Sequence, residues 1–459
     1  MTRHGPIPRA VGQSNRYDVT QWHGDAHEDI GAVINEIVAE VKARQRLADA
    51  DGAGKPGAVI YIPPGDYRLR TQVLIDISYL RIEGSGHGFA SSSIRFNRPE
   101  HEWPDLHELW PGGSRILVDL PVVPRDEVTA DDAEGAAFLV SRTGAPRISS
   151  VEFHGFCIDG LHFVDNGLGG NPENSYINGK TGIYVADAND SIVISGMGMV
   201  YLERAVTIYH ADALSVRSNF IAECGHCVDL RGWGQACTVS DNHIGAGNRG
   251  RSIAAENHGG LLITANNVFP RGASCVHLSG VTRSSVTNNR LHSFYPGMVI
   301  LDAGSSENLV SANHFLRDHE PWTPFTAVHN GEDDQRGLLV LGGNGNSVTG
   351  NHFSEMVDAE LVRPPGATPV IIRVSSGSHN LVATNHVIAH DISARSSDSC
   401  FEAQVGALLA TDAYRVLPVT TVLVEAAASS TVILDSGTDA QVVANRSRNA
   451  VRPTPSPQS

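Results

Sequence analysis

The sequence predicts an all-β protein, a right-handed single-stranded parallel β-helix (a solenoid) with an N-terminal capping helix. The main observation is a repeated motif, V-x-x-N, in which one further residue and then an apolar residue follow the asparagine in nearly every copy. The motif places asparagine at Asn219, Asn242, Asn266, Asn289, Asn313, Asn351, Asn385 and, more weakly, Asn445. The first four intervals are 23, 24, 23 and 24 residues, which is the length of one solenoid turn. Later intervals of 38, 34 and 60 residues predict inserted loops.

The segments between these asparagines favour strands. Stretches such as CVHLSG and SSVTNNRL join short β-branched runs through Gly, Asn and Ser, a pattern typical of parallel rungs connected by turns. A leucine-rich repeat has a similar period, but it needs a leucine framework and a helix in each unit. Stacked turns let each asparagine amide bond to its neighbours where the chain bends. We therefore expect these asparagines to be structural.

The N-terminal region provides a cap for the open end of the solenoid. Apolar residues fall there at helical spacing, with charged residues on the other face: Ile30, Val33, Ile34, Ile37, Val38 and Val41. We expect an N-terminal segment and capping helix over 1–55, the β-helix over 56–450 and a flexible tail over 451–459. The stretch near 97–135 is rich in Pro, Asp and Trp, so it is expected to leave the barrel.

Composition and charge exclude several classes of partner. A hydrophobic content of 41% and a charged content of 18% describe a globular chain that can bury a large core. No apolar run approaches the roughly 20 residues of a membrane-spanning helix, so no membrane partner is expected. A net charge of -16 repels nucleic acid and argues against a polyanionic substrate such as pectin, whereas a neutral polysaccharide fits.

Two short motifs suggest metal chemistry, but neither is complete. Cys224 and Cys227 form a CxxC without a second pair or a spaced histidine pair, so buried small residues are the favoured interpretation over a zinc or redox site. The acidic stretch GEDDQ, residues 331–335, lacks the pattern of a calcium loop and is expected to be a solvated turn. No metal site is predicted.

The stretch from Tyr209 to His258 holds the candidate site, because outward side chains of one sheet form a long groove suited to a polymer. Cleavage of a glycosidic bond needs two carboxyl groups. Asp212 and Glu223 flank the strand that carries Asn219, and each falls in a turn from which a carboxylate can project; the alternative is that both are simply solvated. The candidate substrate-binding residues are His210, Asp229, Arg231, Trp233, Glu256, Asn257 and His258.

Alternation along a strand groups some of these candidates. Asp229 and Arg231 point the same way and either bind sugar hydroxyls or pair with each other. Glu256 and His258 are likewise expected to share a face. Trp233 offers a flat surface for stacking on a sugar ring, with core packing as the alternative.

The spacing of the two acids predicts an oligomer. Eleven residues of extended chain span up to about 35 Å, whereas the carboxylates of an inverting glycosidase lie about 6.5 to 9.5 Å apart. Unless the chain turns sharply, Asp212 and Glu223 of one chain cannot serve the same bond. We expect the site to be completed by a neighbouring subunit.

Eleven strings in the chain resemble the inulin fructotransferases and the related difructose dianhydride hydrolases. They are RYDVTQW, DIGAVINEIVAEVK, IPPGDYRL, YLRIEGSGHGF, NSYINGKTGI, GMGMVYLE, HADAL, IAECGHCVDL, GQACTVSDNHIGAG, AENHGGLLIT and FYPGM. The similarity runs from about Tyr17 to Asn313 and is looser afterwards. The family's catalytic Asp and Glu, eleven residues apart, match Asp212 in HADAL and Glu223 in IAEC.

The resemblance implies a homotrimer of β-helices that acts on inulin or fructo-oligosaccharides and releases a cyclic difructose dianhydride without water or a cofactor. It implies inversion at one anomeric carbon. Our hypothesis is that Glu223 is the main proton donor and acceptor and Asp212 its partner, and the reverse order is the alternative. The 3-hydroxyl as attacking group gives the type III product and the 1-hydroxyl gives type I. Hydrolysis of the dianhydride to inulobiose is the alternative within the family.

Other readings differ from the resemblance in testable ways. A pectin lyase or hydrolase shares the fold but wants a basic or calcium-lined groove. An adhesin or fibre would use the β-helix as a rigid spacer and would not need Asp212 and Glu223. Family members that act on inulin are secreted, yet the N-terminal residues MTRHGPIPRAVGQSNRYDV show no apolar signal core. The region from about His390 to Thr420 also breaks the repeat.

Overall fold

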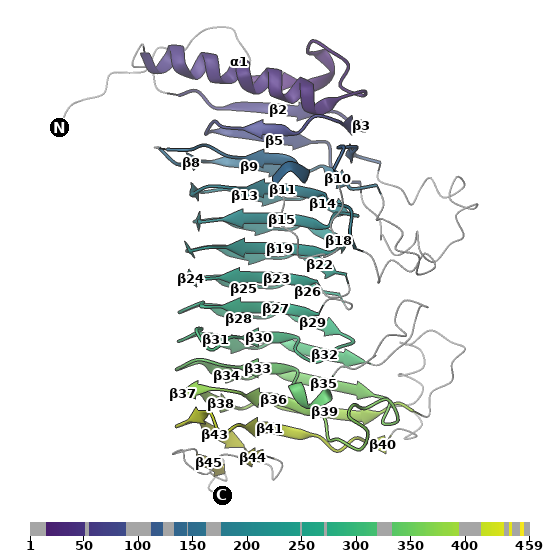
Figure 1. Cartoon of the computed structure of the whole chain (residues 1–459), viewed down its shortest axis with the longest axis vertical. Coiled ribbons are helices and arrows are strands. Elements are labelled where there is room, and N and C mark those ends of the chain that lie inside the picture. The colour runs from purple at the N-terminus through teal and green to yellow at the C-terminus, as the bar shows by residue number, and fades with distance from the viewer. Residues whose placement is uncertain are drawn as a thin grey trace, which may run out of the picture.

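The structure, a computed structural model, describes most of the chain. The described residues are 15–50, 55–88, 112–122, 133–144, 146–161, 176–247, 250–269, 273–318, 333–393, 415–435, 440–442 and 450–453. Within them the strands stack in register below a single long helix, α1 (Ile30–Ala50), to form an elongated solenoid (Figure 1). The predicted parallel β-helix is confirmed. Among these residues no helix has both the length and the apolar character needed to cross a membrane.

Each turn of the chain adds one strand to each of three long sheets, here named A, B and C. Strand pairing is parallel throughout these sheets, except that β40 pairs antiparallel to β39 at the end of sheet B. A short sheet D lies between sheets C and A in five successive turns, and a two-stranded sheet E lies further along. Short 3-10 helices occur at Val19–Gln21 (η1), Ala133–Gly135 (η4) and Asp334–Arg336 (η6).

Sheet A contains β1 (Arg16–Asp18), β2 (Ala58–Ile62), β5 (Leu80–Gly84), β9 (Val151–His154), β13 (Val193–Ser195), β17 (Ser215–Arg217), β21 (Thr238–Ser240), β25 (Leu262–Thr264), β28 (Ser285–Thr287), β31 (Leu309–Ser311), β34 (Ser347–Thr349), β38 (Leu381–Ala383), β43 (Val432–Asp435) and β45 (Ala450–Pro453). Sheet B contains β3 (Gly65–Leu69), β6 (Ser114–Val118), β10 (Cys157–Asp159), β14 (Gly198–Val200), β18 (Phe220–Cys224), β22 (His243–Ala246), β26 (Asn267–Val268), β29 (Arg290–Ser293), β32 (His314–Asp318), β35 (His352–Val357), β39 (His386–Asp391) and β40 (Arg415–Val416).

Sheet C contains β4 (Val73–Ile75), β7 (Ala136–Val140), β11 (Thr181–Val185), β15 (Arg204–Tyr209), β19 (His226–Arg231), β23 (Arg251–Glu256), β27 (Ser274–Ser279), β30 (Val299–Leu301), β33 (Leu339–Leu341), β36 (Val370–Val374), β41 (Thr420–Val424) and β44 (Ala440–Val442). Sheet D contains β8 (Ile148–Ser149), β12 (Asn189–Asp190), β16 (Ala211–Asp212), β20 (Gly234–Gln235) and β24 (His258–Gly259). Sheet E contains β37 (Gly377–Ser378) and β42 (Ala428–Ser429).

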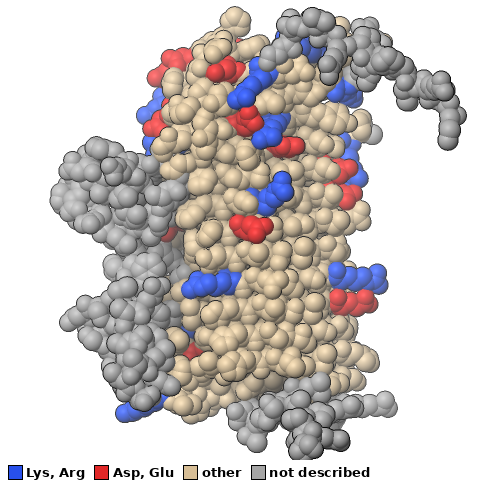
Figure 2. Space-filling view, turned by 180° about the vertical axis from the view of Figure 1, so that it is seen from behind, with Lys and Arg blue, Asp and Glu red and all other residues tan. Residues whose placement is uncertain are grey.

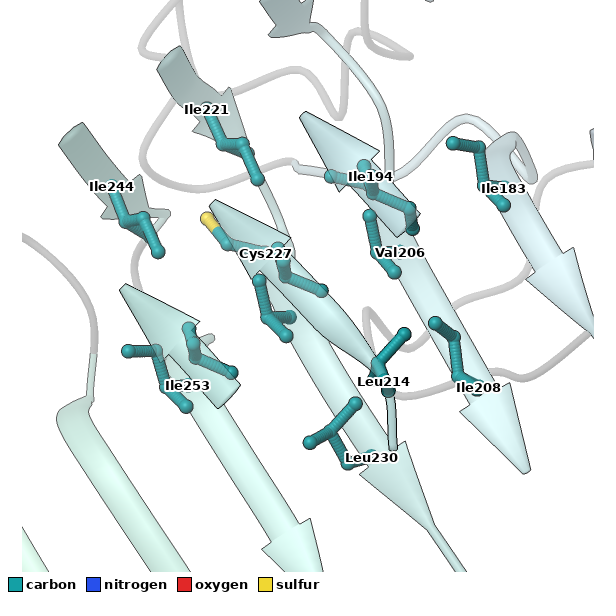
Figure 3. Close-up of a cluster of buried hydrophobic side chains, with 14 of the residues drawn as sticks. Ile183, Ile194, Val206, Ile208, Leu214, Ile221, Cys227, Leu230, Ile244 and Ile253 are labelled. Atoms are coloured by element: carbon teal, nitrogen blue, oxygen red, sulfur yellow. The ribbon is translucent and has the colours of Figure 1, made fainter. Parts of the chain in front are cut away.

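The interior is a continuous apolar column, because inward side chains of successive rungs stack on one another. Ile194, Val206 and Leu230 belong to one buried cluster in which neighbouring rungs contribute side chains that point toward each other (Figure 3). Cys224 and Cys227 are fully buried in the same column, and burial raises the pKa of both thiols. These cysteines are therefore small core residues, as the sequence indicated, and not a reactive pair.

The asparagines of the repeat form the predicted ladder. The side chain of Asn266 donates to Oδ1 of Asn289 at 3.0 Å, and the backbone N–H of Asn266 donates to the same oxygen at 2.9 Å. The same amide also donates to the carbonyl of Val239 at 3.0 Å. Equivalent side-chain bonds of 2.9 to 3.0 Å run unbroken from Asn219 to Asn385. Asn445 lies outside the described residues.

A second, shorter ladder lies at another corner and was not predicted. Asn308 donates to Oδ1 of Asn346 at 3.0 Å, and the backbone N–H of Asn346 donates to Oδ1 of Asn380 at 2.9 Å. In the turn above, Ser284 replaces asparagine, and its backbone N–H donates to Asn308. The mixture of residue types at this corner hides the repeat from a search of the sequence.

Helix α1 closes the N-terminal end as expected, and all six predicted apolar positions are buried. The side chain of Asn35 accepts from the backbone N–H of Leu74 and donates to the carbonyl of Gln72, both at 2.8 Å. It therefore pairs the exposed edge of sheet C with the helix. A Cβ at Gly31 would lie 1.8 Å from the carbonyl oxygen of Thr71, so only glycine allows the helix to approach this closely.

Part of the stretch near 97–135, which was expected to leave the barrel, lies within it. Residues Ser114–Val118 form β6, which pairs with β3 and β10 because Ile116 and Val118 alternate into the core. At its end, 133–135 forms η4; residues 97–111 and 123–132 lie outside the described residues. Ala450–Pro453 form β45, so strand pairing extends into the segment 451–459 that was expected to be a tail.

The expectation of a solvated turn in GEDDQ is wrong at Asp334. This side chain is buried and its carboxylate lies 2.6 Å from the guanidinium of Arg317, which is itself fully buried. Glu355, also fully buried, lies 3.5 Å from the same guanidinium. Charges removed from water need such pairing, and no residue pattern near Asp334 indicates that distant rungs supply its partners.

The asparagine ladder makes a direct prediction for stability. Asn266→Ala removes the acceptor of two bonds from Asn242 and orphans the buried carbonyl of Val239. We expect a loss of about 3 kcal/mol in the free energy of unfolding, measured from urea unfolding followed by circular dichroism. The matched control is Asn267→Ala on the outer surface, where the loss should stay within about 0.5 kcal/mol. Equal losses would contradict a special role for the ladder.

Candidate functional site

Asp212 ends the short strand β16 at the edge between sheets C and A. Its carboxylate accepts a hydrogen bond from the guanidinium of Arg147 at 3.0 Å and another from the side-chain amide of Gln235 at 3.2 Å. Arg147 also lies 3.7 Å from Asp190, which pairs with Asp212 in the turn above. The side chain of Asp212 is 17% exposed. A fixed, accessible carboxylate beside a guanidinium is suited to act as a base.

Glu223 lies at the opposite edge of sheet C, where β18 of sheet B ends and the chain enters β19. Its backbone adopts a left-handed conformation (φ 52°) that turns the chain at this corner. The carboxylate accepts a hydrogen bond from the phenol of Tyr176 at 3.3 Å, and the residue is 8% exposed. A confined carboxyl and a left-handed backbone, two features that favour catalysis, therefore coincide at Glu223.

The structure does not bring Asp212 and Glu223 together within one chain. The strands of sheet C separate the two corners, with sheet D at one edge and β14 and β18 at the other (Figure 1). A six-residue strand such as β19 spans roughly 17 Å. This separation exceeds the distance that an acid and a base serving one glycosidic bond require.

Most other predicted site residues gather at the Asp212 edge. His210 and Trp233 lie in successive turns there, and their rings stack with centroids 5.4 Å apart and planes inclined by 26°. Trp233 is 47% exposed, so it is a surface aromatic and not core packing. Asn257 follows one turn further along and is exposed. A stacked aromatic pair beside a carboxylate provides a surface for a sugar ring.

Asp229 and Arg231 share a face of β19 and pair with each other, as one of the two expectations had it. The carboxylate of Asp229 lies 2.8 Å from Arg231 and 2.6 Å from the buried guanidinium of Arg204. Burial alone would raise the pKa of Asp229, but Arg231 and Arg204 hold the pKa below its ordinary value. The two residues form a structural ion pair. Arg231 is the more accessible of the two and also donates to the hydroxyl of Tyr209 at 3.3 Å.

Glu256 and His258 do not share a face. Asn257 between them is left-handed (φ 50°) and ends β23 of sheet C, so that His258 begins a new strand in sheet D. His258 is buried, with Nδ1 2.6 Å from the carbonyl oxygen of Glu256, and burial lowers the pKa of its imidazole. A Cβ at Gly234 would lie 2.0 Å from its ring. His258 is therefore a packing residue in this structure.

His226 is a buried histidine beside the Arg204 and Asp229 cluster. Its Nδ1 accepts from the backbone N–H of Arg251 at 3.2 Å. Burial and the neighbouring Arg204 lower the pKa of His226 to about 3. The imidazole is therefore uncharged at neutral pH, and its Nδ1 serves as a hydrogen-bond acceptor.

Neither the charge pattern nor the ligand geometry points to a metal or a polyanion. Over the described ranges no three His, Cys, Asp or Glu side chains converge to hold a metal ion. On the face shown in Figure 2, Lys and Arg side chains are scattered among Asp and Glu, and its described residues form no continuous basic patch. The basic or calcium-lined groove that a pectin-degrading enzyme would want is absent from that face.

Several residues of the site were missed from the sequence. Arg147, Tyr176 and Glu203 come from turns before Val216, where the V-x-x-N motif has not yet begun. Gln235 pairs with Asp212 across sheet D, a sheet whose two-residue strands leave no periodic signal. The string NSYINGKTGI contained Tyr176, but nothing in its composition indicated a contact with Glu223.

Comparisons with known proteins agree with this architecture. A family model described as the beta helix repeat of inulin fructotransferase matches residues 312–455, and one described as periplasmic copper-binding protein (NosD) matches residues 160–323. The inulin fructotransferase [DFA-I-forming] of Arthrobacter globiformis is 44% identical over 381 residues, which cover 82% of this chain and 89% of that protein.

Solved structures of the DFA-IIIase of Arthrobacter chlorophenolicus A6 are more similar still. Those of its complexes with DFA-III and with GF2 are each 68% identical to this chain. In the GF2 complex the match covers 97% of this chain and 100% of the other, with a TM-score of 0.89. A form of the same protein without its lid is 64% identical, with a TM-score of 0.85.

The fold defines a protein of the parallel β-helix class, with one held carboxylate at each edge of sheet C. The similarity extends over the turns that carry both corners. The chain belongs to the inulin fructotransferase family.

His226 provides a pH test of the buried cluster. The unfolded chain takes up a proton on this imidazole near pH 6.5, whereas the folded chain does so only near pH 3, so stability falls as the pH drops through this interval. His226→Asn keeps an acceptor for Arg251 but does not titrate. Between pH 7 and pH 5 the parent should lose about 2 kcal/mol more than the variant, measured by urea unfolding. His243→Asn, at an exposed histidine, is the control, and parallel pH profiles for parent and His226→Asn would contradict the prediction.

Proposed function

We propose that this chain releases difructose dianhydride III from the fructose end of inulin by intramolecular transfer. Membership of the inulin fructotransferase family supports the reaction class. The type III product is favoured because the 68% identical relative is named for DFA-III and was solved in complex with it, whereas the DFA-I-forming relative is 44% identical. The single observation that carries the proposal is the pair of held carboxylates, Asp212 and Glu223, at corners outside the barrel.

The chemistry is one displacement at an anomeric carbon. The 3-hydroxyl oxygen of the terminal fructose attacks the anomeric carbon of the next fructose, and the bond from that carbon to the remaining chain breaks. A base accepts the proton of the attacking hydroxyl, and an acid supplies a proton to the leaving oxygen. Glu223, which accepts from the neutral phenol of Tyr176, is the main proton donor and acceptor, and Asp212 beside Arg147 is its partner.

Hydrolysis of DFA-III to inulobiose is the second candidate. It is favoured by one observation, that the 68% identical relative is named DFA-IIIase and was solved with DFA-III bound. Both reactions exchange substituents at the same anomeric carbon and use the same acid and base. They differ in whether a sugar hydroxyl or a water molecule is the second partner.

The proposal includes a homotrimer whose sites lie between subunits. The separation of the two corners supports it, since Asp212 of one subunit can then face Glu223 of the next. The stacked His210 and Trp233 flank Asp212 and supply the sugar-binding surface on that side. Secretion, which the resemblance implied, belongs to the same proposal, because a polymeric fructan is met outside the cell.

Product analysis tests the reaction. The protein is incubated separately with inulin and with purified DFA-III, and the products are resolved by chromatography. A cyclic disaccharide from inulin without free fructose supports the transferase, and inulobiose from DFA-III alone supports the hydrolase. Glu223→Gln and Asp212→Asn should each lower kcat by at least about 100-fold. Full activity of Glu223→Gln, or no product from any fructan, would overturn the assignment.

Subunit mixing tests the shared site. Asp212→Asn and Glu223→Gln chains are coexpressed and compared with each variant alone. If each site takes Asp212 from one subunit and Glu223 from another, about a quarter of the interfaces in a random mixture regain both acids, so activity should return to about a quarter of the parent value. The control is the parent mixed with the double variant. A mixture no more active than the single variants would place both acids of a site in one chain.

A further inference from the structure

Tyr176 is a buried tyrosine in contact with Glu223. Its hydroxyl donates to Oε2 of Glu223 at 3.3 Å, and the whole side chain is 1% exposed. A tyrosine so deeply buried does not stack on a sugar. Its hydroxyl instead contacts the carboxyl group of Glu223.

The segment that carries Tyr176 is fastened to the turn directly above Glu223. The buried carboxylate of Glu203 accepts from the backbone N–H groups of Asn178 at 3.0 Å and Gly179 at 2.7 Å. The side chain of Asn178 in turn donates to the carbonyl of Tyr201 at 2.6 Å. Tyr201 itself donates its N–H to the carbonyl of Glu223 at 3.0 Å. These bonds leave the phenol little freedom.

Gly247 forms the floor beneath the phenol ring. A Cβ added there would lie 2.4 Å from two ring atoms of Tyr176, far inside contact distance. The backbone N–H of Gly247 donates to the carbonyl of Cys224, the residue after Glu223, at 2.6 Å. The ring is thus confined between its own segment and the strand next to Glu223, and any larger residue at position 247 would displace it.

From these contacts we infer that Tyr176 is a positioning residue that holds the Glu223 carboxyl in one orientation for proton transfer. The inference rests on the proposed function, in which Glu223 is the main proton donor and acceptor. Tyr176 therefore sets the direction in which the carboxyl presents its oxygens.

Tyr176→Phe tests the inference by removing the hydroxyl alone. We expect kcat to fall about 10-fold with KM changed less than about twofold. Tyr61→Phe, which loses a bond to Ser85 in the first rungs, is the matched control and should leave kcat and KM unchanged. A kcat of Tyr176→Phe within twofold of the parent would overturn the inference.

Gly247→Ala tests the floor through a double-mutant cycle. If the added Cβ acts by displacing the phenol, the double variant Tyr176→Phe with Gly247→Ala should lose no more kcat than Tyr176→Phe alone. Losses that multiply would show that Gly247 acts through the backbone of Cys224 instead, which contradicts the role given to the floor. Thermal unfolding checks that each variant folds, and if Gly247→Ala does not, the result for Tyr176→Phe decides.

A readout without turnover separates this inference from the proposed function. Infrared spectroscopy follows the carboxyl stretch of Glu223, identified by its loss in Glu223→Gln. In Tyr176→Phe this band should shift in frequency, because the carboxyl loses the hydrogen bond from the phenol. This shift in a protein without activity on fructans would sink the proposed reaction and keep the contact between Tyr176 and Glu223. No shift, with the parent fully active on inulin or DFA-III, would do the reverse.

Discussion

The parallel stacking of turns depends on what happens to polar groups at the corners. A sheet satisfies its own backbone through neighbouring strands, but some N–H and C=O groups at a corner depend on a side chain for their partner. In this molecule the amide of each ladder asparagine accepts from the N–H and the side chain of the asparagine above and donates to a carbonyl of the turn above. Each buried group left unpaired at a corner would cost about 1 to 3 kcal/mol. The ladder therefore fixes the register in which all other residues are placed.

The candidate site follows from the same constraint. Residues within a strand are committed either to the core or to a flat outer face, whereas corner residues can project from the edge of a sheet. His210 and Glu223 both have left-handed backbones, with φ of 53° and 52°. Such a conformation costs a non-glycine residue roughly 1 to 2 kcal/mol, and pairing on both sides offsets it, as in the bond from Tyr201 to the carbonyl of Glu223. Polar side chains at corners are thus held by the scaffold without interrupting it.

The regular part of the chain could be predicted from the sequence because the same residue types recur at the same positions of each turn. The asparagines, the apolar face of α1 and the place of Asp212 and Glu223 at turns all follow from spacing. The prediction failed where the partner comes from a distant turn. Asp334 is charged and was expected in water, yet Arg317 and Glu355 pair with it in the interior. His258 was assigned a face by alternation, which the left-handed Asn257 interrupts.

Buried polar anchors also explain how a strict stack tolerates irregular turns. Arg317, in β32, and Asp334 both lie within the 38-residue interval between Asn313 and Asn351. Their ion pair therefore links two parts of this lengthened turn. Glu203 likewise holds the segment that begins at Tyr176, because its carboxylate accepts hydrogen bonds from two backbone N–H groups of that segment. Removing one partner of such a buried pair leaves an unpaired charge in the interior. The turns that depart from the repeat are therefore held by side chains specific to each, and one of these anchors places a phenol against Glu223.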